Sequence, residues 1–144
     1  PPMNFFDGRL EQDGGDVFFV TGQARIRMLP EQSERLRDRV GGEAVLGVRP
    51  EVMSTRSEGR FAGQDHALDG KVIVVEPLGE RMDVYVSTET NPHVVARLPA
   101  YEQVQPDQQV RLHLEMQRVH MFAPGETGEN LLLTEEDAAV GANA

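Results

Sequence analysis

The sequence predicts an all-β fold, a closed or nearly closed β-barrel of nine or ten short strands with one short surface helix. Three observations lead to this prediction. Residues 70–86 (GKVIVVEPLGERMDVYV) contain two runs rich in β-branched residues around a Pro and a Gly, which is the pattern of a β-hairpin. Residues 109–116 (QVRLHLEM) alternate apolar and polar side chains with a period of two. Gly and Pro separate the other short apolar runs.

The N-terminal half is expected to supply four strands and the helix. The strands are predicted at residues 4–11, 16–20, 24–28 and 44–48. The helix is predicted at 30–40, because it opens with Pro and acidic residues and ends before Gly41 and Gly42. Leu36 and Val40 give this helix only a narrow apolar stripe, so it should cover the core from outside.

The C-terminal half is expected to add the central hairpin, the strand at 109–116 and shorter strands. The hairpin should turn at residues 77–80, and the shorter strands are predicted at 93–98, 119–122 and 130–133. Residues 54–69 are predicted to form a long loop. Residues 134–144 are predicted to form a disordered acidic tail, which follows a single OB-like domain at 1–133. The predicted core consists of Phe5, Phe19, Ile26, Val48, Val72, Val74, Val84, Val86, Val95, Leu112, Leu114 and Phe122.

The composition excludes several classes of function. A formal charge of −10 over 144 residues argues against binding to nucleic acid or to an anionic membrane surface. The absence of Cys excludes disulfides and thiolate sites, and a cytoplasmic location is consistent with that absence. The chain begins PPMNFF without an initiator methionine, so it is expected to be a piece of something longer.

No catalytic motif is found in the sequence. The four His lack metal-site spacing, and neither a Gly-x-Ser-x-Gly elbow nor a phosphate-binding loop is present. Glu76 and Glu51 each close an apolar run beside a Pro. Glu76 is interpreted as an exposed or turn-capping carboxylate or as a polar interface residue, and Glu51 as the partner of Arg49 in a local salt bridge. Phe5 and Phe122 are assigned to the core, with an interface as the alternative.

Five motifs in one order resemble a known family. They are MNFFDG at 3–8, LGVRPE at 46–51, GKVIVVEPLG at 70–79, ARLP at 96–99, and VHMF with TGENL at 119–122 and 127–131. Together they resemble the C-terminal regulatory domain of the ATPase subunits of bacterial ABC importers of the maltose and glycerol-3-phosphate type. The resemblance implies an OB-like barrel of the transport-associated type, with ATP, Mg²⁺ and the catalytic residues in a separate nucleotide-binding domain.

The resemblance also implies regulatory positions. Phe5, Gly47, Gly70, Glu76 and Phe122 fall on family positions tied to regulation or to the docking of regulator proteins. Arg49, Glu51 and Gly79, from the same motifs, complete the set of interface candidates. Asp107 and His113 stand where relatives often carry Gly, so a binding surface built around those glycines is in doubt.

Two hypotheses of different classes follow. The first is a non-catalytic regulatory and dimerisation domain that acts by protein contact, at the cytoplasmic face of a membrane transporter for sugars or related solutes. Its partners would be a second copy, the transporter's membrane subunits and a regulator protein. The second is a barrel that senses an oxyanion or metabolite at a subunit interface, which would need Arg25, Arg27, Arg49 or Arg111 to converge.

Overall fold

The computed structural model describes residues 2–125 and 128–133 and consists mainly of antiparallel strands. The strands are β1 (Asn4–Asp13), β2 (Asp16–Thr21), β3 (Ala24–Arg27), β4 (Glu43–Val48), β5 (Met53–Ser54), β6 (Ala67–Leu78), β7 (Arg81–Thr88), β8 (Val94–Pro99), β9 (Gln109–Leu114) and β10 (His120–Phe122). The helix α1 (Pro30–Leu36) and the 3₁₀ turns η1 (Arg37–Arg39), η2 (Pro50–Val52), η3 (Gly59–Phe61) and η4 (Met116–Arg118) connect them.

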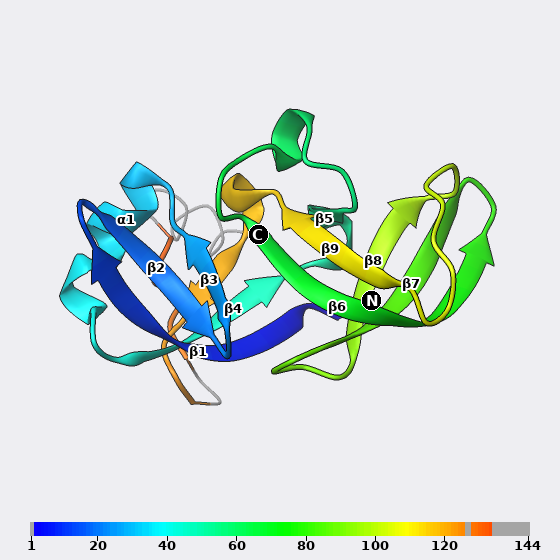
Figure 1. The fold of residues 1–144 in the computed structure, drawn as a ribbon. Helices are drawn as coiled ribbons and strands as arrows, with labels where there is room; N and C mark the ends of the chain where they lie inside the picture. Colours follow the sequence, from blue (N-terminus) through cyan, green and yellow to red (C-terminus); the bar gives the residue numbers. More distant parts are fainter. Residues whose placement is uncertain (1, 126–127, 134–144) are drawn as a thin grey trace, which may run out of the picture.

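The strands form two five-stranded sheets. The first has the order β10-β4-β1-β2-β3 and the second β5-β9-β6-β7-β8. Figure 1 shows the first sheet with α1 at the left and the second sheet at the right, while the short strand β10 returns the chain from the second sheet to the first. One continuous apolar cluster draws on both sheets, so the described residues share a single core. The predicted all-β class with one short helix is confirmed.

The helix is shorter than predicted. It ends at Leu36, and the chain continues as the turn η1 instead of regular helix to Val40. Gln32 fixes its start, because its Oε1 accepts a hydrogen bond from the Leu29 N–H (2.9 Å) and its Nε2 donates to the Met116 carbonyl (2.7 Å). Leu36 is fully buried, so the helix covers one end of the core as expected.

The central hairpin is present, but the residues of its turn and the side chains that it buries differ from the prediction. Pro77 and Leu78 belong to β6, and the turn consists of Gly79 and Glu80. A bulge between Val72 and Val74 shifts the register with β7. Because a bulge changes which side chains share a face, Val72 is fully buried whereas Val74 is 49% exposed.

The predicted core has three further exceptions. Phe5 is exposed, and Val95 and Phe122 are only half-buried. The alternating neighbours Phe6 and Val94 fill the core in place of Phe5 and Val95. The predicted loop at 54–69 also contains the end of β5, the turn η3 and the start of β6, while the strand expected at 130–133 is reduced to a bridge between Asn130 and Phe122. The predicted tail at 134–144 lies outside the described residues.

Candidate protein interface

Three of the predicted interface residues meet on the outer face of the first sheet. Pairing of β1 with β4 sets Phe5 opposite Gly47, and pairing of β10 with β4 sets Phe122 opposite Val45. The rings of Phe5 and Phe122 pack edge to face, with centroids 5.9 Å apart and planes inclined by 63°. Phe5 is 52% exposed, so these rings form an apolar surface and not part of the core.

Gly47 makes room for this surface. A Cβ at Gly47 would collide with the Met3 sulfur and lie 2.7 Å from Cε2 of Phe122. Met3 and Phe122 therefore pack directly over bare backbone, and we call Met3, Phe5, Gly47 and Phe122 the outer aromatic cluster. A hollow of about 340 Å³ adjoins it, lined by Phe5, Val45, Phe122, Ala123, Gly125 and Gly128. The Met3 contribution was missed, although its i, i+2 spacing from Phe5 was the available signal.

Glu76 and Gly79 lie instead on the β6–β7 hairpin. Glu76 is exposed and sits opposite Asp83 across the two strands. Its exposure agrees with the interpretation of a solvated carboxylate on a strand edge. Gly79 takes a positive φ of 82° in the two-residue turn, so its immediate role is to close the hairpin. Exposed Ile73 and Leu78 give this hairpin an apolar surface of its own.

Gly70 packs inside the second sheet. It pairs with Thr88 on one side and Val110 on the other. A Cβ there would collide with Cγ1 of Val86 and come within 3.0 Å of the Ser87 carbonyl oxygen. The space beside Gly70 is therefore filled by this chain's own strand β7, and its regulatory role remains a prediction implied by the resemblance.

Arg49 and Glu51 do not form the predicted local salt bridge. Glu51 faces Arg118, with 3.8 Å between the charged atoms. The turn η2 begins between Arg49 and Glu51, and this turn separates their side chains. Arg49 lies in a different hollow, with His120 and Arg118 among its lining residues.

Three of the arginines that an oxyanion site would need are bound to acids of this chain. Arg25 pairs with Asp13 (3.3 Å) and Arg111 with Asp69 (2.8 Å). Arg27 pairs with Asp16 and Asp65, at 2.7 and 3.1 Å respectively. Arg25 and Arg111 line one hollow together with Asp65 and Asp69, whereas Arg49 lines another, so the positive charge near the first hollow is offset by this chain's own acids.

Two of the histidines, His66 and His113, line one hollow, and burial is the main influence on the pKa of three of the four. Burial lowers the pKa of His66, His113 and His120, and nearby arginines lower the pKa of the last two further. Within residues 2–125 and 128–133, no group of three or more His, Asp or Glu side chains is placed to hold a metal ion. No helix in this part of the chain has both the length and the apolar character needed to cross a membrane.

The two departures from the family pattern, Asp107 and His113, lie in a turn and in a strand respectively. Asp107 adopts a left-handed conformation, with φ of 70°, which is a backbone shape that Gly favours and Asp tolerates better than most residues. His113 lies in β9 opposite Ala67 of β6 and Ser54 of β5. The fold therefore retains the turn that a glycine at position 107 would make.

Family comparisons agree with this architecture. Residues 1–53 match the model of the MalK OB fold domain, and residues 46–122 match the model of the TOBE domain. Neither matched model is that of an ATPase catalytic domain. In the solved structures, the fold is similar to the molybdate-binding protein ModG, with a TM-score of 0.63, 17% identity, and coverage of 84% of this chain and 96% of that one.

The curated relatives are ATP-binding proteins of ABC transporters. The chain is 30% identical to an uncharacterized ABC transporter ATP-binding protein, YurJ, of Bacillus subtilis, over 90% of this chain and 35% of the relative. It is 29% identical to the trehalose/maltose import protein MalK of Thermococcus litoralis, over 85% and 32%. The chain thus spans about a third of the length of these relatives. The matches confirm the resemblance to sugar-importer ATP-binding subunits that the motifs indicated.

Proposed function

Since the chain belongs to the TOBE domain family, we propose that it is a regulatory and dimerisation domain at the C-terminal end of the ATP-binding subunit of an ABC importer. One observation carries the proposal. Phe5, Gly47 and Phe122, which the resemblance ties to regulation, come from three strands and meet on one exposed surface. A surface of aromatic and methionine side chains is suited to contact with another protein.

The proposal assigns ATP, Mg²⁺ and bond breaking to another domain of the parent subunit. The importer would carry sugars or related solutes, because several relatives are named as sugar-import proteins. The domain would lie at the cytoplasmic face of the membrane, in a complex with membrane subunits. Its own contacts would be with a second copy, by two-fold pairing, and with a regulator protein.

The experiment uses the complete importer and compares a double variant with a single control variant. Phe5→Ala with Phe122→Ala removes both rings of the outer aromatic cluster, while Tyr101→Ala removes a ring that is 73% exposed elsewhere. We expect the double variant to change the response of ATP hydrolysis and solute uptake to regulation, while the Tyr101 variant leaves both unchanged. Sedimentation over a range of concentrations measures self-association of the same variants. The proposal fails if the double variant matches the parent in all three measurements while remaining folded.

Ligand sensing is a weaker second candidate. Its support is the fold similarity to ModG, but at 17% identity this similarity concerns the fold alone. A thermal-shift panel of sugars, sugar phosphates and oxyanions tests it. A ligand at about 100 times its dissociation constant should add roughly 2.7 kcal/mol to the free energy of unfolding. No shift across the panel would remove this candidate.

A further inference from the structure

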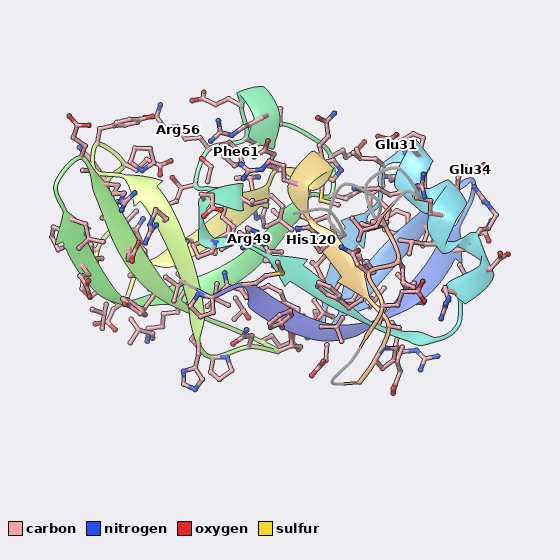
Figure 2. All side chains as sticks on the ribbon, turned by 180° about the vertical axis from the view of Figure 1, so that it is seen from behind. Glu31, Glu34, Arg49, Arg56, Phe61 and His120 are labelled. Carbon is pink, nitrogen blue, oxygen red and sulfur yellow. The ribbon has the colours of Figure 1, made fainter. Side chains whose placement is uncertain are left out.

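A basic hollow lies between α1, the end of β4, the turn η4 and β10. Its volume is about 610 Å³, and its charged lining consists of Arg35, Arg49 and Arg118 against the single acid Glu31, with His120 beside them. Figure 2 shows Arg49 and His120 next to each other near the ends of their strands. In a chain with a formal charge of −10, this local excess of positive charge needs an explanation. We call Arg35, Arg49, Arg118 and His120 the basic hollow.

Two like charges share the basic hollow. His120, the first residue of β10, lies opposite Gly47 of β4, and Arg118 and Arg49, just outside these two strands, both line the hollow beside it. Like charges this close in space repel one another. Arg118 is partly neutralised by Glu115 (3.3 Å) and Glu51 (3.8 Å).

Arg49 has no such neutralising partner within residues 2–125 and 128–133. Among the residues that the structure describes, no carboxylate lies within salt-bridge distance of its guanidinium group, which is exposed. Both Arg49 and Arg118 lower the pKa of His120 in addition to the effect of burial. The positive potential of these two groups therefore reaches the imidazole ring.

His120 is held with one N–H free to donate. The Leu132 N–H donates to Oδ1 of Asn130 (3.1 Å), which fixes the orientation of that amide. Nδ2 of Asn130 consequently donates to Nδ1 of His120 (2.9 Å), so the neutral ring carries its proton on Nε2. The ring is also stacked on Phe122, with centroids 6.1 Å apart. The basic hollow thus combines guanidinium groups with an oriented neutral donor.

We propose that the basic hollow is an anion-binding site for a carboxylate or phosphate group. Arg49 and Arg118 supply charged donors, and Nε2 of His120 supplies a directed one. An anion between the two guanidinium groups would be attracted to both and would offset their mutual repulsion. This inference goes beyond the proposed regulatory and dimerisation function and does not depend on it. Of the four arginines weighed in the sequence for an oxyanion site, the basic hollow contains only Arg49.

The bound carboxylate or phosphate group could come from either of two sources. One is a free anionic small molecule or metabolite. The other is the acidic run Glu135-Glu136-Asp137 of this same chain, which follows closely in sequence after Leu133, a residue that lines the hollow. Charge complementarity is the same for both, so the experiment must separate them.

The test is a titration of the whole chain with inorganic phosphate at constant ionic strength, followed by the NMR signals of the His120 ring. We expect saturable shifts and a rise in the pKa of His120, because a bound anion stabilises the imidazolium form. Arg49→Ala should weaken binding by about tenfold or more, since a hydrogen bond to a charged group is lost. Arg49→Lys should weaken it less. The control Arg39→Ala removes an exposed arginine of η1 outside the hollow and should bind as the parent does.

A second variant, Glu135→Gln/Glu136→Gln/Asp137→Asn, identifies the source. If phosphate binds this variant more tightly than the parent, the chain's own acidic run occupies the site. If both bind phosphate equally, the site takes a free anion. The proposal is overturned if neither protein shows a saturable His120 shift, or if Arg49→Ala binds phosphate as tightly as Arg39→Ala does.

Discussion

The side-chain amide of Asn4 in β1 forms two hydrogen bonds with the backbone of Val95 in β8. Oδ1 of Asn4 accepts from the Val95 N–H, and Nδ2 donates to the Val95 carbonyl, both at 2.9 Å. Nδ2 also donates to the Val48 carbonyl of β4 (3.0 Å). Asn4 is 5% exposed, and its side-chain amide joins the first sheet to the second in the way that backbone pairing joins neighbouring strands.

Asn4→Ala should lower the free energy of unfolding by about 2–4 kcal/mol, because it leaves buried backbone groups of Val95 and Val48 unpaired. Asn4→Asp should also destabilise, since it keeps the acceptor but loses both donated bonds. Urea denaturation measures these changes, with exposed Gln103→Ala as the control. A loss below about 1 kcal/mol for Asn4→Ala would show that this amide does not join the sheets.

Two glycines of the first sheet should respond differently to alanine. At Gly8, a Cβ would collide with the Val20 carbonyl oxygen and with the Phe19 ring, which is fully buried. The backbone and the packed core cannot move aside to make room, so Gly8→Ala should lower the free energy of unfolding by about 3 kcal/mol or more. At Gly47 the colliding atoms are side-chain ends of Met3 and Phe122, so Gly47→Ala should cost about 1 kcal/mol and displace the outer aromatic cluster. Equal thermal shifts for the two variants would contradict this difference.

Removal of Arg97 should leave the buried carboxylate of Asp83 without its ion-pair partner. Arg97 donates from Nε to Oδ1 of Asp83 (2.9 Å) and from Nη2 to Oδ2 (3.2 Å), and this lowers the pKa of Asp83. Arg97→Met should lower the free energy of unfolding by about 3 kcal/mol near neutral pH. Because the pKa of Asp83 is lowered on folding, its contribution is present above the ordinary carboxyl pKa and is lost as the pH falls through the folded value. The gap between parent and variant in denaturation experiments should therefore narrow in acid, and a constant gap would count against this ion pair.

The histidines should make the protein less stable in mild acid. Burial lowers the pKa of His66 and of His113 below the ordinary value of about 6.5. A group whose pKa is lowered in the folded state takes up its proton more readily after unfolding, so stability should fall as the pH drops below about 6.5. His66→Gln/His113→Gln should reduce the pH dependence of the free energy of unfolding between about pH 7.5 and pH 5.5. An unchanged slope in the double variant would exclude these two rings as its cause.

Local patterns explain how much of the fold was predictable. The period-two run at 109–116 and the β-branched runs around Gly79 correctly predicted β9 and the β6–β7 hairpin. These patterns are readable because a strand buries alternate side chains whichever strand it later pairs with. The error at Val74 arose where the bulge breaks that alternation, and nothing in the letters VIVVE marks the bulge.

The candidate interface was predictable only through resemblance. The motifs named Phe5, Gly47 and Phe122 singly, and composition placed both aromatics in the core. Their meeting depends on the register of β1 and β10 on either side of β4, which joins residue 5 to residue 47 and residue 122 to residue 45. The domain boundary at residue 133 remains a prediction.

The sequence by itself determined the all-β class, most strand positions and the absence of the searched catalytic motifs, because these depend on neighbouring residues along the chain. The tertiary structure alone decided that Phe5 and Phe122 face outward, that Asn4 joins the sheets, and that Arg49 meets Arg118 beside His120. The physical reason is that facing and proximity are set by long-range strand pairing. A single-residue change of register there would exchange the buried and exposed sides of a strand.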